Sequence, residues 1–153
     1  MTIAGFVPRL SMVTLGVDDL RRATKFWTGM GFTVGDSTPD IVFFQSGDMV
    51  FSLYGRAALA AEMAAETAAD TTPQLDGSPQ SIGLSINVFE AITVQPVLDL
   101  AATLGGRIVK SAEVAFWGGT SGYFADPDGH RVEVAHNPFW VMDAGGRIRL
   151  PGS

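Results

Sequence analysis

Hydrophobic residues recur at the spacing of a helix face in some segments of this chain and form short strand-like stretches in others, and the same order of segments occurs twice. In the first half, an apolar stretch at residues 10–17 leads into residues 20–30, where apolar side chains recur at the spacing of one helix face. Short apolar stretches separated by Gly, Ser, Asp and Pro then predict strands. These strands are expected at residues 32–34, 41–45 and 49–54, which gives the order βαβββ.

The second half repeats this order after a connection. Residues 56–69 are mostly alanine and predict a helix, whereas residues 70–80 hold two prolines among Gly, Ser and Asp, which is typical of a linker. A second βαβββ set is expected, with a strand at 82–88, a helix at 93–104 and strands at 107–114, 122–125 and 131–135. The repeat predicts an α+β fold in one structural domain. Its parts are a first module at 7–55, a connecting helix and linker at 56–80, a second module at 81–137 and a C-terminal tail at 138–153.

Composition and charge limit the partners of the chain. Its 153 residues, 46% hydrophobic and 17% charged, are enough for one cored domain. A net charge of −6 disfavours nucleic acids and anionic membranes as partners. The absence of cysteine excludes disulfides, thiolate metal sites and cysteine nucleophiles. Because the sequence has no signal-like segment and no apolar stretch of about 18 residues, we expect a cytoplasmic protein without a membrane span.

A predicted hairpin at residues 122–136 carries the best candidate for chemistry. Residues 126–129, Asp-Pro-Asp-Gly, are suited to a turn because Pro presets φ, Asp bonds to its own backbone and Gly adopts a left-handed conformation. In the strand that follows, Glu133 alternates with Val132 and Val134, so its carboxylate points away from the face of the valines. An inward-facing carboxylate needs a partner. Glu133 is therefore a candidate general base or ligand-orienting group, and the alternative is a carboxylate that is only hydrogen-bonded or salt-bridged in a wet cup.

Two segments resemble a known superfamily. Residues 12–32 combine an opening strand, an acidic turn, a helix with aromatic residues and a closing Gly-Phe, and residues 123–133 read Tyr-Phe-Ala-Asp-Pro-Asp-Gly-His-Arg-Val-Glu. Both resemble the vicinal oxygen chelate superfamily, which groups glyoxalase I-like enzymes, bleomycin-resistance proteins and extradiol dioxygenases. The resemblance covers residues 7–138. It implies that the two βαβββ modules form a curved mixed sheet, or cup.

The resemblance also implies where metal ligands would lie, because the metal enzymes of the family take ligands from the first and last strands of each module. Those positions fall here on Met12 and Phe51 in the first module and on Gly83 and Glu133 in the second. Only Glu133 has a metal-binding side chain. One carboxylate with water does not hold iron, zinc or nickel tightly. We therefore expect no cofactor, and a divalent metal is the alternative.

The two histidines do not add to such a site. His136 lies three residues after Glu133, so in an extended strand the two side chains point to opposite faces. His130 directly follows the turn glycine. We interpret both histidines as surface or hairpin-supporting residues; the alternative is that one of them enters a site.

The predicted ligand-binding residues line the inward face of the cup. Trp117 belongs to a glycine-rich segment that either leans over a planar ligand or closes the edge of the core. The full set, chosen by strand alternation and this loop, is Met12, Thr14, Phe51, Ser85, Trp117, Tyr123 and Glu133.

The tail is apolar at residues 137–142 and needs a cover. It either packs back on its own sheet as an extra strand or turn, or is buried in a homodimer. Dimers are frequent in the resembled family, so we expect a homodimer.

Three functions stay open at this stage. The first is a protein with a degenerate metal site that binds a small, partly aromatic molecule in the cup. The second is a metal-independent lyase or isomerase with Glu133 as its general base. The third is a metal-dependent lyase or dioxygenase of the glyoxalase type, for which the ligands at Met12, Phe51 and Gly83 are lacking.

Overall fold

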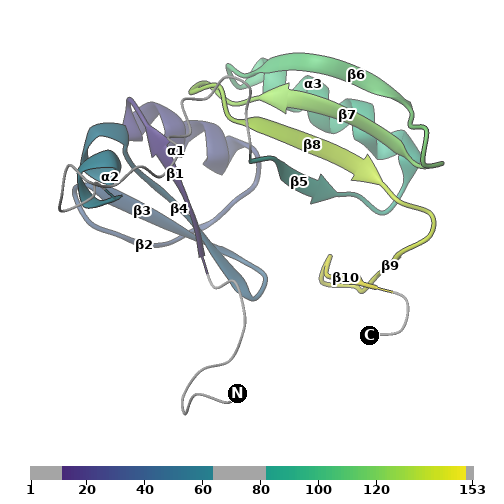
Figure 1. Ribbon diagram of the computed structural model, residues 1–153, viewed down its shortest axis with the longest axis horizontal. Helices are drawn as coiled ribbons and strands as arrows, with labels where there is room; N and C mark the ends of the chain where they lie inside the picture. Colours follow the sequence, from purple (N-terminus) through teal and green to yellow (C-terminus); the bar gives the residue numbers. More distant parts are fainter. Residues whose placement is uncertain (1–11, 64–81, 151–153) are drawn as a thin grey trace, which may run out of the picture.

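The two halves of the chain form two four-stranded sheets with the same topology (Figure 1). The computed structural model describes residues 12–63 and 82–150. The first sheet has the order β1-β4-β3-β2, formed by Met12–Val17, Met49–Gly55, Ile41–Ser46 and Val34–Ser37. The second has the order β5-β8-β7-β6, formed by Leu84–Asn87, Arg131–His136, Thr120–Ala125 and Arg107–Val114. In each sheet the first strand runs parallel to the last, so the predicted α+β fold of two βαβββ modules is confirmed.

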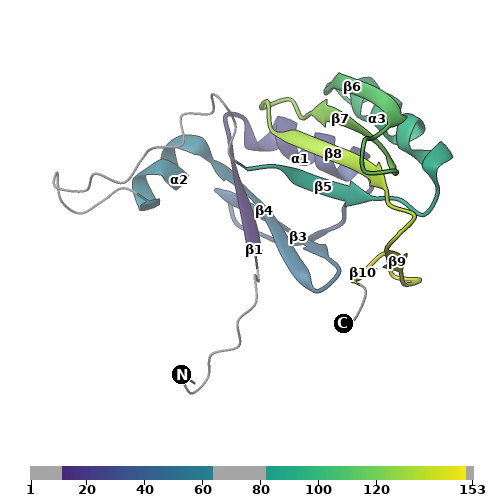
Figure 2. The same cartoon turned by 45° about the vertical axis from the view of Figure 1, so that its right-hand side comes forward.

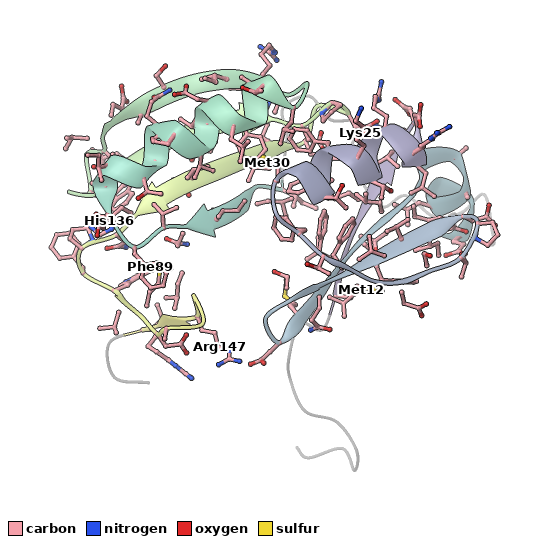
Figure 3. The ribbon with its side chains drawn as sticks, turned by 180° about the vertical axis from the view of Figure 1, so that it is seen from behind. Met12, Lys25, Met30, Phe89, His136 and Arg147 are labelled. Carbon is pink, nitrogen blue, oxygen red and sulfur yellow. The ribbon has the colours of Figure 1, made fainter. Side chains whose placement is uncertain are left out.

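The helices lie on both sides of the sheets: those at 20–29 and 94–103 pack against the core faces, whereas the one at 56–63 covers one end of the opposite face of the first sheet, where a Cβ built on Gly16 would lie 3.4 Å from Leu59 (Figures 1 and 3). They are α1 (Leu20–Gly29), α2 (Arg56–Met63), the 3-10 helix η1 (Ala91–Thr93) and α3 (Val94–Thr103). Asp19 caps α1, since its side chain accepts a hydrogen bond from the Arg22 N–H at 2.9 Å. None of the helices in the described part of the chain is long and apolar enough to span a membrane.

One hydrophobic core runs from the first module into the second. Phe26 and Trp27 on α1 are buried, and the Phe26 ring lies 6.1 Å from the ring of Phe124 on β7. A Cβ built on Gly29 would lie 2.7 Å from the side chain of Leu104, so the end of α1 packs directly against the end of α3. The two modules are therefore packed together through their helix-facing layers.

A buried carboxylate adds a polar link between the modules. Oδ1 of Asp128, in the β7–β8 turn, accepts hydrogen bonds from the Asp18 backbone N–H at 2.9 Å and from Arg22 Nη2 at 3.0 Å. The side chain of Asp128 has 0% exposure. Arg56 of α2 in turn donates to Asp18 at 2.8 Å, and this bond lowers the pKa of Asp18. The turn thus joins the second module to the first at the β1–α1 junction.

Two predicted elements differ from the structure. The strand expected at 32–34 is wrong, because Phe32 donates its N–H to the Trp27 carbonyl at 3.1 Å and packs its ring against Trp27; β2 begins only at Val34. The tail does not add a strand to the second sheet, so the extra strand is wrong: β9 (Val141–Met142) pairs with β10 (Ile148–Arg149) in a separate hairpin (Figure 2), although the Phe139 ring does pack back, 3.1 Å from a Cβ built on Gly118.

The remaining segment predictions are tested only in part. The helix expected at 56–69 is confirmed as far as Met63, and its remainder and the linker at 70–80 lie outside the described residues. The module boundaries stay predictions. Phe139 is 66% exposed, so within the described chain the tail is left partly uncovered and the homodimer also stays a prediction.

Candidate functional site

Four side chains lie in one row across the second sheet. The register pairs Ser85 of β5 with Glu133 of β8, Glu133 with Tyr123 of β7, and Tyr123 with Lys110 of β6. On either side of Glu133 along β8, the two valines are buried against the core. The prediction that Glu133 faces away from these valines is therefore confirmed, and its row lies on the sheet face opposite α3.

Glu133 is half-buried and held by hydroxyl groups. Ser85 Oγ donates to Glu133 Oε2 at 2.9 Å. The pKa of Tyr123 is raised by its burial and, in addition, by the negative charge of Glu133 and a hydrogen bond to it. The phenol proton of Tyr123 is therefore retained beside the carboxylate.

The cation in the same row is engaged elsewhere. Lys110 Nζ lies 2.6 Å from Glu113 Oε1, and the hydrogen bond and charge of Glu113 raise the pKa of Lys110. Among the described residues, Glu133 makes no ion pair with any lysine, arginine or histidine. The carboxylate is thus positioned by neutral groups and has no structural counter-ion in this part of the chain.

The first module carries an equivalent pair on its own outer face. Thr14 of β1 lies opposite Ser52 of β4, and their hydroxyl oxygens are 2.7 Å apart. This is the same position between a first and a fourth strand that Ser85 and Glu133 occupy in the second module. Met12 is two residues from Thr14 on the same strand and half-exposed, so the two share a face, as predicted.

Phe51 does not belong to this face. It is 7% exposed and packs under α1, with its ring 4.7 Å from that of Trp27 and 5.3 Å from that of Phe44. The prediction that Phe51 occupies the position equivalent to Glu133 is wrong, and Ser52 occupies it. Sequence reasoning missed Ser52, although its alternation with the apolar Phe51 and Leu53 was a signal that could have found it.

Trp117 lies at the end of the second sheet. It belongs to the tight turn between β6 and β7, in which the Ala115 N–H bonds to the Gly119 carbonyl at 2.8 Å. Its indole covers Gly119 so closely that a Cβ there would be 1.8 Å from the ring. Gly119 adjoins the Thr120–His136 pair, three positions along the strand from the Tyr123–Glu133 pair. Trp117 therefore closes the sheet edge, and the structure does not bring it to Glu133.

The histidines also lie apart from Glu133. His130 Nδ1 is 2.8 Å from Oδ2 of the buried Asp126, whose Oδ1 accepts the His130 backbone N–H at the same distance. This confirms that His130 supports the hairpin. His136 Nδ1 approaches the carbonyl of Val88 at 3.4 Å, near the end of the module where Figure 3 labels Phe89.

The donor set does not fit a catalytic metal ion. The equivalent first- and fourth-strand positions offer the hydroxyls of Thr14, Ser52 and Ser85 and the carboxylate of Glu133. No group of three His, Cys, Asp or Glu side chains converges anywhere in the described ranges. Zinc, iron and nickel require imidazole, thiolate or several carboxylate ligands. We therefore derive no chemistry through a metal.

Comparisons with known proteins agree on the fold. The sequence model of the Glyoxalase/Bleomycin resistance protein/Dioxygenase superfamily matches residues 9–134. A glyoxalase-related enzyme from Fulvimarina pelagi is 28% identical with a TM-score of 0.81, covering 95% of this chain and 100% of that one. A lactoylglutathione lyase from Agrobacterium tumefaciens is 20% identical with a TM-score of 0.61, covering 86% and 95%. A superfamily enzyme from Burkholderia phytofirmans PsJN is 14% identical with a TM-score of 0.67, covering 82% and 96%. No curated protein matches the sequence.

Proposed function

Since this chain belongs to the Glyoxalase/Bleomycin resistance protein/Dioxygenase superfamily, we propose that it binds a small, partly aromatic molecule on the sheet face around Glu133. The observation that carries the proposal is the half-buried Glu133 carboxylate, oriented by Ser85 and Tyr123 without a structural cation. A fixed acceptor beside an aromatic side chain is the kind of site that orients a ligand of this type.

The geometry supports binding because the acceptor is already in place before a ligand arrives. A carboxylate that leaves water is destabilised unless other groups donate to it. Ser85 donates to Glu133 at 2.9 Å and Tyr123 lies directly across from it, and both come from regular strands whose register fixes their positions. Binding therefore requires little reordering of side chains, which is a main cost of association.

A second candidate function rests on Tyr123. Its raised pKa keeps a phenol proton beside Glu133, so the pair resembles a general base with a neighbouring proton donor. This supports a metal-independent lyase or isomerase with Glu133 as the base. A metal-dependent lyase has less support, because the hydroxyl-rich donor set does not suit the ion and the similar lyase from Agrobacterium tumefaciens shows the fold alone.

The test is a fragment screen by ligand-observed NMR, run in parallel on the natural chain, on Glu133→Gln and on Glu90→Gln. Glu90 is exposed at the start of η1 and its side chain makes no capping bond, so it controls for loss of one negative charge. We expect aromatic fragments whose binding weakens at least about tenfold in Glu133→Gln only, the size of one charged hydrogen bond. Equal binding to all three proteins would refute the proposed site.

Metal analysis completes the test. We expect mass spectrometry of the untagged protein to find no stoichiometric iron, zinc, nickel or manganese after incubation with each ion. Stoichiometric metal that is lost in Glu133→Ala would contradict the proposal and favour the metal-dependent lyase or dioxygenase.

We also propose that the chain forms a homodimer in the cytoplasm. The support is the number of large apolar side chains left in water around the tail and the β6–β7 turn, among them Phe116, Phe139 and Trp140. Light scattering coupled to size exclusion checks it: a mass near 32 kDa, twice the 16.2 kDa of one chain, is expected, and a mass of one chain would contradict it.

A further inference from the structure

Glu133 carries a negative charge that the described residues leave uncompensated. Its row contains two neutral hydroxyl side chains, and the one cation in the row, Lys110, is bound to Glu113 at 2.6 Å. Arg131 is two residues away on the same strand face, but it makes no ion pair with Glu133. Glu133 is therefore the carboxylate of this row that has no ion-pair partner among the described residues.

The carboxylate also has unused hydrogen-bonding capacity. Two carboxylate oxygens offer about four acceptor positions. Ser85 occupies one position on Oε2, and the neighbouring Tyr123 phenol takes up at most one more. The positions that remain are acceptors only, so they bond to a ligand that brings N–H or O–H donors.

We propose that the ligand of this face is an aromatic amine cation, with a primary ammonium or an amidinium group directed at Glu133. This inference rests on the proposed function and deepens it by naming the ligand class. An ammonium brings three donors and an amidinium brings a fork of parallel N–H groups, and both neutralise the carboxylate. A carboxylate or phosphate ligand would instead meet the charge of Glu133 with its own.

The neighbour of Glu133 adds to the preference for a cation. Tyr123 lies directly across from Glu133 in the antiparallel pair β7–β8, where side chains on one face are about 5 Å apart at Cβ. A cation bound to the carboxylate therefore comes within reach of the phenol ring, at the separation of a cation–π contact. The aromatic body of the ligand can then lie along the sheet face opposite α3, which no helix of the described residues covers.

The test compares three ligands of nearly equal shape: phenethylamine, 2-phenylethanol and phenylacetate. Affinities are measured at pH 7 by NMR titration of the natural chain, Glu133→Gln and the charge control Glu90→Gln. We expect the amine to bind the natural chain about 10- to 100-fold more tightly than the alcohol, and phenylacetate to bind least. Glu133→Gln removes this preference, whereas Glu90→Gln preserves it.

A further variant tests the electrostatic origin of the preference. Glu113→Gln frees the ammonium of Lys110 in the same row, so we expect amine binding to weaken and phenylacetate binding to improve relative to the natural chain. Circular dichroism confirms that each variant is folded.

The outcomes separate this inference from the proposed function. If the alcohol or phenylacetate binds as tightly as the amine and binding still depends on Glu133, the ligand class is wrong and the site stands. The same holds if none of the three binds but the fragment screen finds neutral or anionic ligands that depend on Glu133. If no ligand of any class depends on Glu133, the proposed function fails, and this inference with it.

Discussion

The link between Arg22 and Asp128 gives the sharpest stability prediction, because it joins the two modules through a carboxylate that water does not reach. Asp128 Oδ1 accepts from Arg22 Nη2 at 3.0 Å and from the Asp18 N–H at 2.9 Å, while Oδ2 has no partner among the described residues and is buried. Removing Arg22 by mutation to Ala leaves a desolvated negative charge with one neutral donor. We expect this change to destabilise the fold markedly.

The magnitude follows from the burial of each partner. Breaking a fully buried ion pair from one side costs about 3–5 kcal/mol, whereas a hydrogen bond to a charged group contributes about 1.5–3 kcal/mol. Arg22 is 48% exposed and Asp128 is 0% exposed. Because solvent screens the charge of Arg22, we expect the cost of Arg22→Ala to lie in the range for a hydrogen bond to a charged group, at about 2 kcal/mol. For a chain of this length, that corresponds to a fall in Tm of about 4–8 °C.

Asp128→Asn should cost less than Arg22→Ala. The substitution keeps the shape and an oxygen that accepts from the Asp18 N–H, and it removes the buried charge that would otherwise need Arg22. In the Asp128→Asn background, Arg22→Ala should then cost less than about 0.5 kcal/mol, which gives a coupling energy of about 1.5 kcal/mol, within the range for contacting residues.

Urea unfolding of the four proteins of this cycle, followed by tryptophan fluorescence, measures the free energy of unfolding of each one. Arg21→Ala is the matched control, because Arg21 is the neighbouring arginine of α1 and is exposed. Additive effects of Arg22→Ala and Asp128→Asn, or a cost of Arg22→Ala equal to that of the control, would refute the argument that this bond holds the modules together.

Two further predictions concern the second sheet. Gly122→Ala should lower the free energy of unfolding by about 1–3 kcal/mol, because the new Cβ would lie 2.5 Å from Leu98 and 2.8 Å from a backbone oxygen. Gly83→Ala is the control and should cost far less, since a Cβ there meets nothing within 4 Å. Equal costs of the two substitutions in urea unfolding would contradict the close packing at Gly122. In a chain whose other tyrosine is replaced by Phe, ultraviolet titration should show that the pKa of Tyr123 lies above the ordinary tyrosine value. In Glu133→Gln the pKa of Tyr123 should move back toward the ordinary value. A Tyr123 pKa that does not change in Glu133→Gln would contradict the contact between the two side chains. Since the folded state holds this proton more tightly, Tyr123 should make stability fall as the pH rises from the ordinary tyrosine pKa through the raised one.

Local patterns in the sequence were sufficient for most of the fold. The helical spacing of Ala23, Phe26 and Trp27 predicted the buried face of α1 because a helix has a fixed period, and these three side chains are buried. The Asp-Pro-Asp-Gly turn predicted the β7–β8 hairpin, since its turn chemistry is local. The hydrogen bonds of Asp128 to the first module were not predictable, because they depend on how two segments far apart in sequence pack together.

The position of Phe51 shows where the reasoning from turns fails. Phe51 is equivalent to Glu133 only if the turn glycines Gly47 and Gly129 are matched, but the first hairpin is closed by the pair Ser46–Met49, with two residues in its turn, whereas the second is closed by Ala125–Arg131, with five. In both hairpins the first paired residue lies two positions after the glycine, but Met49 shares the core-facing side of β4 with Phe51, whereas Arg131 shares the outer side of β8 with Glu133. Matching the two glycines is therefore one residue out of register, and a shift of one residue exchanges the faces of a strand.

The pairing of the parallel strands gives the correct equivalence, because each fourth strand lies beside the first strand of its own module. Thr14–Ser52 and Ser85–Glu133 are then the matching pairs, and each is hydrogen-bonded, at 2.7 Å and 2.9 Å. The two modules therefore keep the same polar position on the same sheet face, while only the second places a charge there. This asymmetry is why the binding of a ligand by charge is assigned to the second module, and why the neutral pair of the first module is suited only to hydrogen bonding.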